Sequence, residues 1–227
     1  MFFEVDLVHL HRRGRADATT AGKRIMIYAI ILAAGRSQRM GTQKLLLPLA
    51  RKPVITRIVD ELQACQLQEL LVVVGRDGRR IQKALAGRRV RFLSNPESAG
   101  DMLSSIRCGL RAMPAGGSGF LVVLGDQPNV TAELVGMLIA GFTRSGSGIV
   151  VPTHRGHRAH PVLLAARFRD ELMSGYEGVG LRGLLNAHPN EVYPVEIANG
   201  ALLRDMDKPE DYQRELAAVS DDLDQRI

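Results

Sequence analysis

The chain has 227 residues, a formal net charge of +6, 4% aromatic residues and no tryptophan. This length suits one domain, which buries enough apolar surface to fold without metal or disulfide staples. The apolar runs are far shorter than the roughly 20 residues of a membrane helix, and few aromatic side chains are available to stack on single-stranded nucleic acid. We therefore expect a soluble protein with neither a membrane nor a nucleic acid as partner.

The cysteine content indicates a reducing compartment. Only Cys65 and Cys108 are present, and they form neither a CxxC motif nor a metal-ligand spacing. We therefore expect a cytoplasmic protein.

Residues 1–25 show no lasting periodicity and are predicted to form a disordered extension. Asp6 and His9 interrupt their apolar stretch, so a signal peptide is not expected, and Met26 is hypothesised to be the natural start. A single domain is predicted over residues 26–217. An acidic, frayed tail is predicted over residues 218–227.

Strands and helices alternate through the first part of this domain. Short apolar runs predict strands at 27–32, 70–74, 90–93 and 120–124, whereas helical spacing predicts helices at 53–65, 77–85 and 102–113. Pro53 suits a first helical position, and Thr131 is expected to cap a further helix. This succession predicts an α/β fold with three layers around a doubly wound, mostly parallel sheet.

The rhythm changes after Gly148. Residues 149–152 and 161–165 are predicted to be strands separated by a basic, His-rich turn, which together resemble an antiparallel hairpin laid over the sheet. The remaining predicted elements are a helix at 168–173, a helix at 181–187, a strand at 192–197 and a helix from Pro209.

The first predicted strand runs directly into a basic, glycine-containing loop. In open α/β sheets ligands lie at the carboxyl ends of strands. Gly35 and Gly41 permit a close backbone approach or a positive φ, while Arg36, Arg39 and Lys44 supply donors for phosphate oxygens. The spacing fits neither GxGxxG nor GxxxxGK[ST]. The loop favours a triphosphate site, and the alternative is a basic surface turn.

A second polar turn, Gly125-Asp126-Gln127-Pro128, follows another apolar strand. A carboxylate facing a cationic loop suits a hard cation bound to a polyphosphate, so Asp126 is a candidate metal ligand. The alternative is that Asp126 only forms a turn or caps a helix.

A third candidate is the segment Asp205-Met206-Asp207. Alternation in an extended segment places both carboxylates on one side, where Asp207 would complete a magnesium site. Asp207 also precedes Pro209 and is equally well interpreted as a helix N-cap.

Much of the basic excess lies between Arg76 and Arg91, where seven cations face Asp77 alone. Such runs are usually solvated helix faces, and direct contact with an anionic ligand is the less favoured interpretation.

Three segments, in this order and separation, resemble the MobA-like NTP transferase family: LAAGRSQRMGTQK at 32–44, GDQP at 125–128 and DMDKPED at 205–211. The resemblance spans residues 26–217 and favours the branch of molybdenum cofactor cytidylyltransferases. Ala33-Ala34 resembles the cytidylyl form of the loop, because guanylyl members usually carry a glycine pair. The family implies a Rossmann-type fold like that of nucleotide-diphospho-sugar transferases.

The resemblance implies transfer of CMP from CTP to the phosphate of a molybdenum-loaded molybdopterin, with release of pyrophosphate. Lys44, Arg39 and Asp126 would be catalytic, and Asp126 and Asp207 would bind Mg²⁺, with Mn²⁺ as the alternative. The nucleotide-binding residues would be Leu32, Ala33, Ala34, Gly35, Arg36, Ser37, Gly41, Lys44, Asn95, Ser104 and Ser105. The acceptor-binding residues would be Gln127, Pro128, His160 and Arg182. A purely structural role for His160 is the alternative.

Two positions depart from the family pattern. Asp101 stands where members commonly have glycine, and Glu177 lies where a Gly-Asp pair is often found. An extra carboxylate near an anionic acceptor would repel it, so three alternatives stay open. They are a nucleotidyltransferase that uses another nucleotide such as GTP, one that uses another phosphorylated acceptor such as a sugar phosphate, and a non-catalytic maturation factor that hands the cofactor to a molybdoenzyme.

Overall fold

The computed structural model describes residues 25–35, 37–97 and 101–224. The expected extension, apart from Ile25, and the candidate ligand Arg36 lie outside these ranges. Within them, no helix combines the length and apolar character needed to cross a membrane.

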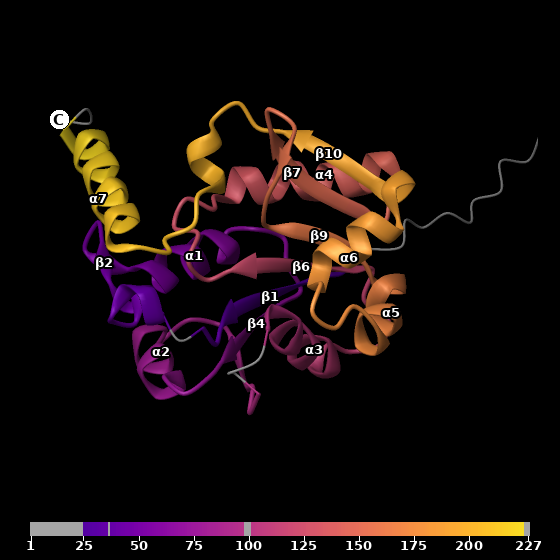
Figure 1. The fold of residues 1–227 in the computed structure, drawn as a ribbon, viewed down its shortest axis with the longest axis horizontal. Coiled ribbons are helices and arrows are strands. Elements are labelled where there is room, and N and C mark those ends of the chain that lie inside the picture. Colours follow the sequence, from indigo (N-terminus) through magenta and orange to yellow (C-terminus); the bar gives the residue numbers. More distant parts are fainter. Residues whose placement is uncertain (1–24, 36, 98–100, 225–227) are drawn as a thin grey trace, which may run out of the picture.

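The centre of the molecule is a mostly parallel sheet in the order β10-β7-β9-β6-β1-β4-β5 (Figure 1). Its parallel half comprises β1 (Ile27–Ala33), β4 (Glu69–Val74), β5 (Arg91–Ser94) and β6 (Gly119–Leu124). β1 lies between β4 and β6, with Ile30 opposite Leu71 on one side and Val122 on the other. These side chains are fully buried, as expected for strands with both faces covered.

The predicted position of the C-terminal hairpin is wrong. β9 (Val162–Ala165) does not lie over the sheet but within it, antiparallel to both β6 and β7 (Ile149–His154). All four residues of β9 are buried, so a place inside the sheet covers both of its apolar faces. A short β8 (His157–Arg158) pairs with β7, and β10 (Val192–Glu196) extends the sheet in parallel beyond it.

Helices cover both faces of the sheet, which confirms the three-layer, doubly wound fold. Ile27, Ala29 and Ile31 of β1 face one apolar core, while Tyr28 and Ile30 face the other. The first core contains α1 (Val54–Gln63), α2 (Gly78–Ala84), α4 (Ala132–Ser145) and the side of α7 (Pro209–Asp224). The second contains α3 (Met102–Ala112), α5 (Arg169–Ser174) and α6 (Gly180–Ala187).

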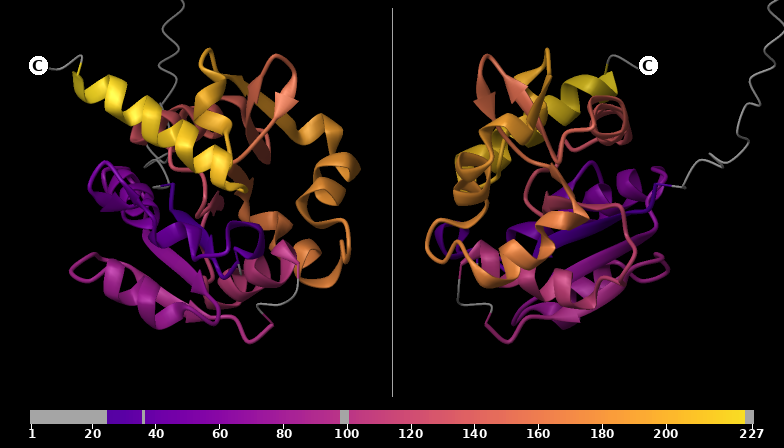
Figure 2. Two further views of the ribbon diagram at one scale, coloured as in Figure 1. Left: turned by 60° about the vertical axis from the view of Figure 1, so that its left-hand side comes forward. Right: turned by 90° about the vertical axis from the view of Figure 1, so that its right-hand side faces the viewer.

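Two local features differ from the sequence predictions. A small hairpin of β2 (Pro48–Leu49) and β3 (Lys52–Pro53) precedes α1, so the helix begins at Val54 instead of Pro53. α7 lies beside this hairpin (Figures 1 and 2), where the Tyr212 hydroxyl donates to the Pro48 carbonyl at 2.7 Å. The helix continues to Asp224, within the segment expected to form an acidic tail.

Candidate active site at the carboxyl edge of the sheet

The loop after β1 is held in place by a buried amide, that of Gln43. Its side-chain oxygen accepts a hydrogen bond from Ser37 Oγ at 2.9 Å, and its Nε2 donates to Asp77 Oδ2 at 3.0 Å. Ser37 Oγ in turn accepts from the Lys44 backbone N–H at 3.2 Å. Gly41 has φ +65°, the left-handed conformation for which a glycine was expected there. The loop is therefore ordered around Lys44 by its own side chains.

Lys44 lies between two carboxylates that come from distant parts of the chain. Its Nζ is 2.5 Å from Asp126 Oδ2 and 2.8 Å from Asp207 Oδ1. We call Lys44, Asp126 and Asp207 the carboxylate corner. The ammonium side chain is only 12% exposed.

The close pairing of β1 and β6 brings Asp126 to Lys44. The Gly125 N–H donates to the Leu32 carbonyl at 3.1 Å. A Cβ at position 125 would lie 2.7 Å from that same oxygen, so only glycine fits between the two strand ends. The GDQP turn therefore begins directly against the end of β1.

The charges and hydrogen bonds within the carboxylate corner shift the pKa values of Lys44 and Asp207. Burial lowers the pKa of Lys44, but the charge of Asp126 and the hydrogen bonds to both carboxylates outweigh it, so that pKa is raised. The hydrogen bond from Lys44 lowers the pKa of Asp207 against a smaller effect of burial. Lys44 is therefore a cation and Asp207 an anion at neutral pH.

The Asp205-Met206-Asp207 segment is attached to the GDQP turn. Met206 is fully buried, and its N–H donates to the Asp126 carbonyl at 3.0 Å. Gln127 Nε2 donates to Asp205 Oδ1 at 2.6 Å. Burial and the charge of Asp126 raise the pKa of Asp205. Of the two aspartates in this segment, Asp205 therefore faces Gln127 and Asp207 contacts Lys44.

The carboxylate of Asp207 does not act as a helix cap. Its oxygens accept from Lys44 Nζ and, at 3.1 Å, from Arg39 Nη1. The backbone N–H groups of Asp207 and Lys208 donate instead to Asp211 Oδ2, at 3.0 and 2.8 Å. Of the two interpretations of Asp207, the structure supports a side chain directed at the loop cations.

A buried glutamate on α7 supports this arrangement from behind. Glu215 is 2% exposed, and its Oε2 accepts from Asn129 Nδ2 at 2.6 Å. Its Oε1 lies 3.3 Å from Nε of Arg204, the residue directly before Asp205. Glu215 thus connects both carboxylate-bearing segments, and no local sequence motif indicated this role.

The carboxylate corner fits a divalent cation that is bound together with a nucleotide. Two carboxylate oxygens already converge on one cationic atom, Lys44 Nζ. The described residues offer no group of three or more acidic, histidine or cysteine side chains that could hold a metal. Mg²⁺ is commonly held by one or two carboxylates completed by substrate phosphates, which matches a two-carboxylate site.

The other predicted nucleotide ligands fall into two groups. Ala33 and Ala34 are buried at the end of β1, as Leu32 is in part, whereas Gly35 is exposed and no atom lies within 4 Å of where its Cβ would be. Asn95, Ser104 and Ser105 lie together between β5 and α3. There Asn95 Nδ2 donates to the two serine hydroxyls at 3.1 and 3.0 Å, so these groups hold one another.

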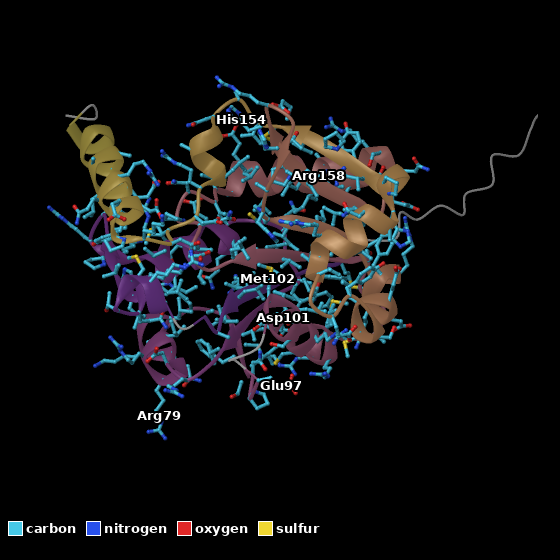
Figure 3. The ribbon with its side chains drawn as sticks, viewed as in Figure 1. Arg79, Glu97, Asp101, Met102, His154 and Arg158 are labelled. Carbon is cyan, nitrogen blue, oxygen red and sulfur yellow. The ribbon has the colours of Figure 1, made fainter. Side chains whose placement is uncertain are left out.

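A cavity of about 620 Å³ lies between α3, α6 and the chain before β9. Its polar lining includes Asp101, Arg158, His160 and Arg182, and its rim includes the exposed Met102 and Val179. Figure 3 shows Arg158 on one side of this region and Asp101 with Met102 on the other. We call it the acceptor cavity, because it contains two of the four residues predicted to bind the acceptor.

Two cations that line the acceptor cavity are unpaired within the part of the chain that the structure describes. No described residue forms a side-chain hydrogen bond or ion pair with Arg158 or Arg182. Burial lowers the pKa of His160 and outweighs both its hydrogen bond to the backbone of Val122 and the charge of Asp126, so the imidazole is neutral at pH 7. The cavity therefore presents two available positive charges.

Gln127 and Pro128 lie apart from the acceptor cavity. Gln127 is 2% exposed and tied to Asp205, and Pro128 lines a separate pocket of about 240 Å³ with Lys52 and Arg57. The structure thus separates these two residues from His160 and Arg182.

The two departures from the family pattern have local structural explanations. Asp101 is the N-cap of α3, where its Oδ1 accepts from the Ser104 N–H at 3.0 Å. Glu177 accepts from Arg107 Nη2 at 2.7 Å, and this hydrogen bond lowers its pKa. The charge of Glu177 is therefore balanced by Arg107.

Comparison with known proteins agrees with this geometry. Residues 29–192 match the MobA-like NTP transferase domain. The chain belongs to this family. The matched range includes the basic loop, the GDQP turn and the acceptor cavity, so the predicted resemblance is confirmed.

Individual proteins of known sequence or structure are also similar to this chain. The chain is 27% identical over 189 residues to the molybdenum cofactor cytidylyltransferase of Escherichia coli (strain K12), which covers 82% of this chain and 93% of that protein. It is 32% identical over 154 residues to the bifunctional protein GlmU of Symbiobacterium thermophilum, but spans only 32% of that longer protein. A nucleotidyl transferase structure from Methanothermobacter thermautotroptrophicus superimposes with a TM-score of 0.74 at 27% identity, covering 86% and 97% of the two chains.

Proposed function

We propose that this protein transfers CMP from CTP to the phosphate of a molybdopterin-type acceptor and releases pyrophosphate. The observation that carries the proposal is the convergence of Lys44, Asp126 and Asp207 at the carboxyl edge of the sheet. The similarity to the Escherichia coli cytidylyltransferase over most of both chains supports the choice of nucleotide and acceptor.

The reaction forms one phosphorus–oxygen bond and breaks another. An acceptor phosphate oxygen attacks the α-phosphorus of CTP, and the bond to the bridging oxygen of the leaving pyrophosphate breaks. Lys44 and Arg39 would donate to the triphosphate and stabilise the charge that builds on that oxygen. The acceptor phosphate is already ionised at neutral pH, so positioning replaces a strong general base.

Asp126 and Asp207 would hold the divalent cation, Mg²⁺ or alternatively Mn²⁺. Such an ion, when bound, neutralises phosphate charge and polarises the phosphoryl group. The backbone from Leu32 to Gly35, with Ser37 and Gly41, would surround the nucleotide, and the open space beside Gly35 supports a close approach there. Asn95, Ser104 and Ser105 would shape the wall near the base.

The acceptor would bind in the acceptor cavity. Its volume of about 620 Å³ is typical of small-molecule sites. Arg158 and Arg182 supply charge for a phosphate, and Met102 and Val179 supply apolar surface for a ring system. A molybdoenzyme or its maturation factor would receive the product.

A pyrophosphate-release assay tests this function. The protein is supplied with Mg²⁺, a molybdopterin-type acceptor and one of CTP, GTP, UTP or ATP, and we expect release with CTP well above the other three. Thermal stabilisation by each nucleotide gives a second reading that is independent of the acceptor. Equal stabilisation and equal turnover with all four would refute the cytidylyl assignment.

One further candidate is a sugar phosphate as acceptor, because the segment at 32–44 also resembles the loop of sugar nucleotidyltransferases. Replacing the molybdopterin-type acceptor with hexose 1-phosphates in the same assay separates the two. Turnover with the sugar phosphate alone would establish this second candidate and exclude the first.

A further inference from the structure

The ammonium group of Lys44 lies between the two carboxylates that would hold the metal ion. It lies 2.5 Å from Asp126 Oδ2 and 2.8 Å from Asp207 Oδ1, and it is the one cationic atom that contacts both carboxylates among the described residues. Arg39 contacts only the other oxygen of Asp207, from a side chain that is 70% exposed. Lys44 and a divalent ion would therefore compete for both carboxylates, whereas Arg39 contacts only one of them.

A metal ion and the Lys44 ammonium group cannot both occupy the position between Asp126 Oδ2 and Asp207 Oδ1. Mg²⁺ requires its oxygen ligands at about 2.0–2.1 Å, so an ion ligated by both carboxylates would take the place of the ammonium group. Two like charges at such short range repel each other strongly in a partly buried site. A metal ion bound through these two oxygens would therefore displace the side chain of Lys44.

The loop lets the side chain leave while its backbone stays in place. The Lys44 N–H is held by Ser37 Oγ, and the residue begins a 3-10 helix, Lys44–Leu46. Gln43 ties the same stretch to Asp77. Only the flexible four-carbon stem has to move, and a triphosphate offers anionic oxygens to the departing ammonium group.

We propose that Lys44 blocks the metal site of the free protein, and that a bound nucleoside triphosphate opens this site by drawing Lys44 onto its phosphates. This inference rests on the proposed metal role of Asp126 and Asp207. It explains how a site with only two carboxylates remains compact and paired without the ion. Metal would bind weakly alone and tightly together with the nucleotide.

The test measures Mn²⁺ binding to the full-length protein by electron paramagnetic resonance, with no nucleotide present. Lys44→Met removes the competing cation but keeps the length of the side chain, and we expect Mn²⁺ to bind about tenfold tighter, because a blocked site lowers the apparent affinity by the fraction that is open. Arg39→Met is the matched control, since it removes the same charge from Asp207 without clearing the position between the carboxylates. We expect it to change the affinity by less than about threefold.

A second measurement adds a non-hydrolysable CTP analogue. The analogue should tighten Mn²⁺ binding to the unsubstituted protein more than to Lys44→Met, because the variant has no block to relieve. If Lys44→Met binds Mn²⁺ no more tightly than Arg39→Met does, the inference is overturned. Lys44→Gln gives the same reading if Lys44→Met fails to fold in a thermal melt.

Asp126→Asn and Asp207→Asn distinguish this inference from the proposed function. If neither variant weakens Mn²⁺ binding in the presence of the analogue, the metal role of these carboxylates fails, and the proposal on Lys44 fails with it. If both variants weaken binding but Lys44→Met does not strengthen it, only the proposal on Lys44 is wrong.

Discussion

The carboxylate corner and the acceptor cavity differ in whether their charged side chains form ion pairs. In the corner, Lys44 contacts Asp126 and Asp207 within 2.8 Å and Arg39 contacts Asp207 at 3.1 Å, so every charged side chain has an ion-pair partner inside the protein. In the cavity, Arg158 and Arg182 have no ion-pair partner among the described residues. A paired site is ordered before its ligand arrives and must exchange partners to bind it. An unpaired site keeps its charge for an incoming anion.

The two regions also differ in how they are built. The corner joins the ends of neighbouring parallel strands, β1 and β6, and is supported by the buried Glu215 of α7. The cavity is formed by the start of α3, by α6 and by the chain before β9. Gly178 and Gly180, at the start of α6, both have positive φ. We therefore expect substitutions in the corner to affect the chemical step and substitutions in the cavity to affect acceptor binding.

The largest expected effect is that of Asp126→Asn in the corner. Because this variant removes one of the two carboxylates that would hold the divalent cation, kcat for pyrophosphate release should fall by about 10²–10³-fold, in the range found when one electrostatic contact to a reacting group is lost. Asp205→Asn is the matched control, and its smaller effect is expected because Asp205 faces Gln127. Full activity in Asp126→Asn would show that the carboxylate corner does not affect the chemical step.

Arg182→Ala in the acceptor cavity should weaken binding of the acceptor and leave binding of CTP unchanged. Loss of a charged hydrogen bond is worth about 1.5–3 kcal/mol, so KM for the acceptor should rise about tenfold or more while KM for CTP stays unchanged. Arg158→Ala should behave in the same way. Arg79→Ala, on the exposed face of α2 (Figure 3), serves as the control for net charge. A rise in KM for CTP would show that the two regions are not separate.

Glu215→Gln tests the support behind the corner. The variant keeps the shape of a buried side chain but weakens its contacts with Asn129 and Arg204, so the free energy of unfolding in urea should fall by about 1–3 kcal/mol. Glu210→Gln, on an exposed position of the same helix, should change it far less. If the two variants are equally stable, Glu215 does not support the carboxylate corner.

The smallest expected effect is that of His160 on the pH dependence of stability. Burial lowers the pKa of His160 in the folded protein below the value of 6.5 for a free imidazole. The unfolded chain therefore binds more protons below about pH 6.5, and this residue makes stability fall as pH decreases from there. His160→Gln should reduce the slope of unfolding free energy against pH between pH 6.5 and 5. An unchanged slope in His160→Gln would contradict this role of His160.

Some of this site could be predicted from local sequence. Apolar runs followed by LAAGRSQRMGTQK and by GDQP place two polar loops at strand ends, because parallel strands with crossover helices end at the same edge of a sheet. The fold class and the MobA-like family followed from the same segments and are confirmed. The individual ligand roles stay predictions.

Other features depend on contacts that no local pattern encodes. The sequence by itself determined the alternating elements and singled out Lys44 and Asp126 as candidate site residues, because strand periodicity and motif residues are read within a few positions. Only the tertiary structure decided that β9 lies inside the sheet, that Asp207 and not Asp205 reaches Lys44, and that Glu215 supports both carboxylate segments. The physical reason is that burial and hydrogen bonds between residues more than 70 positions apart distinguish side chains that the local sequence does not distinguish.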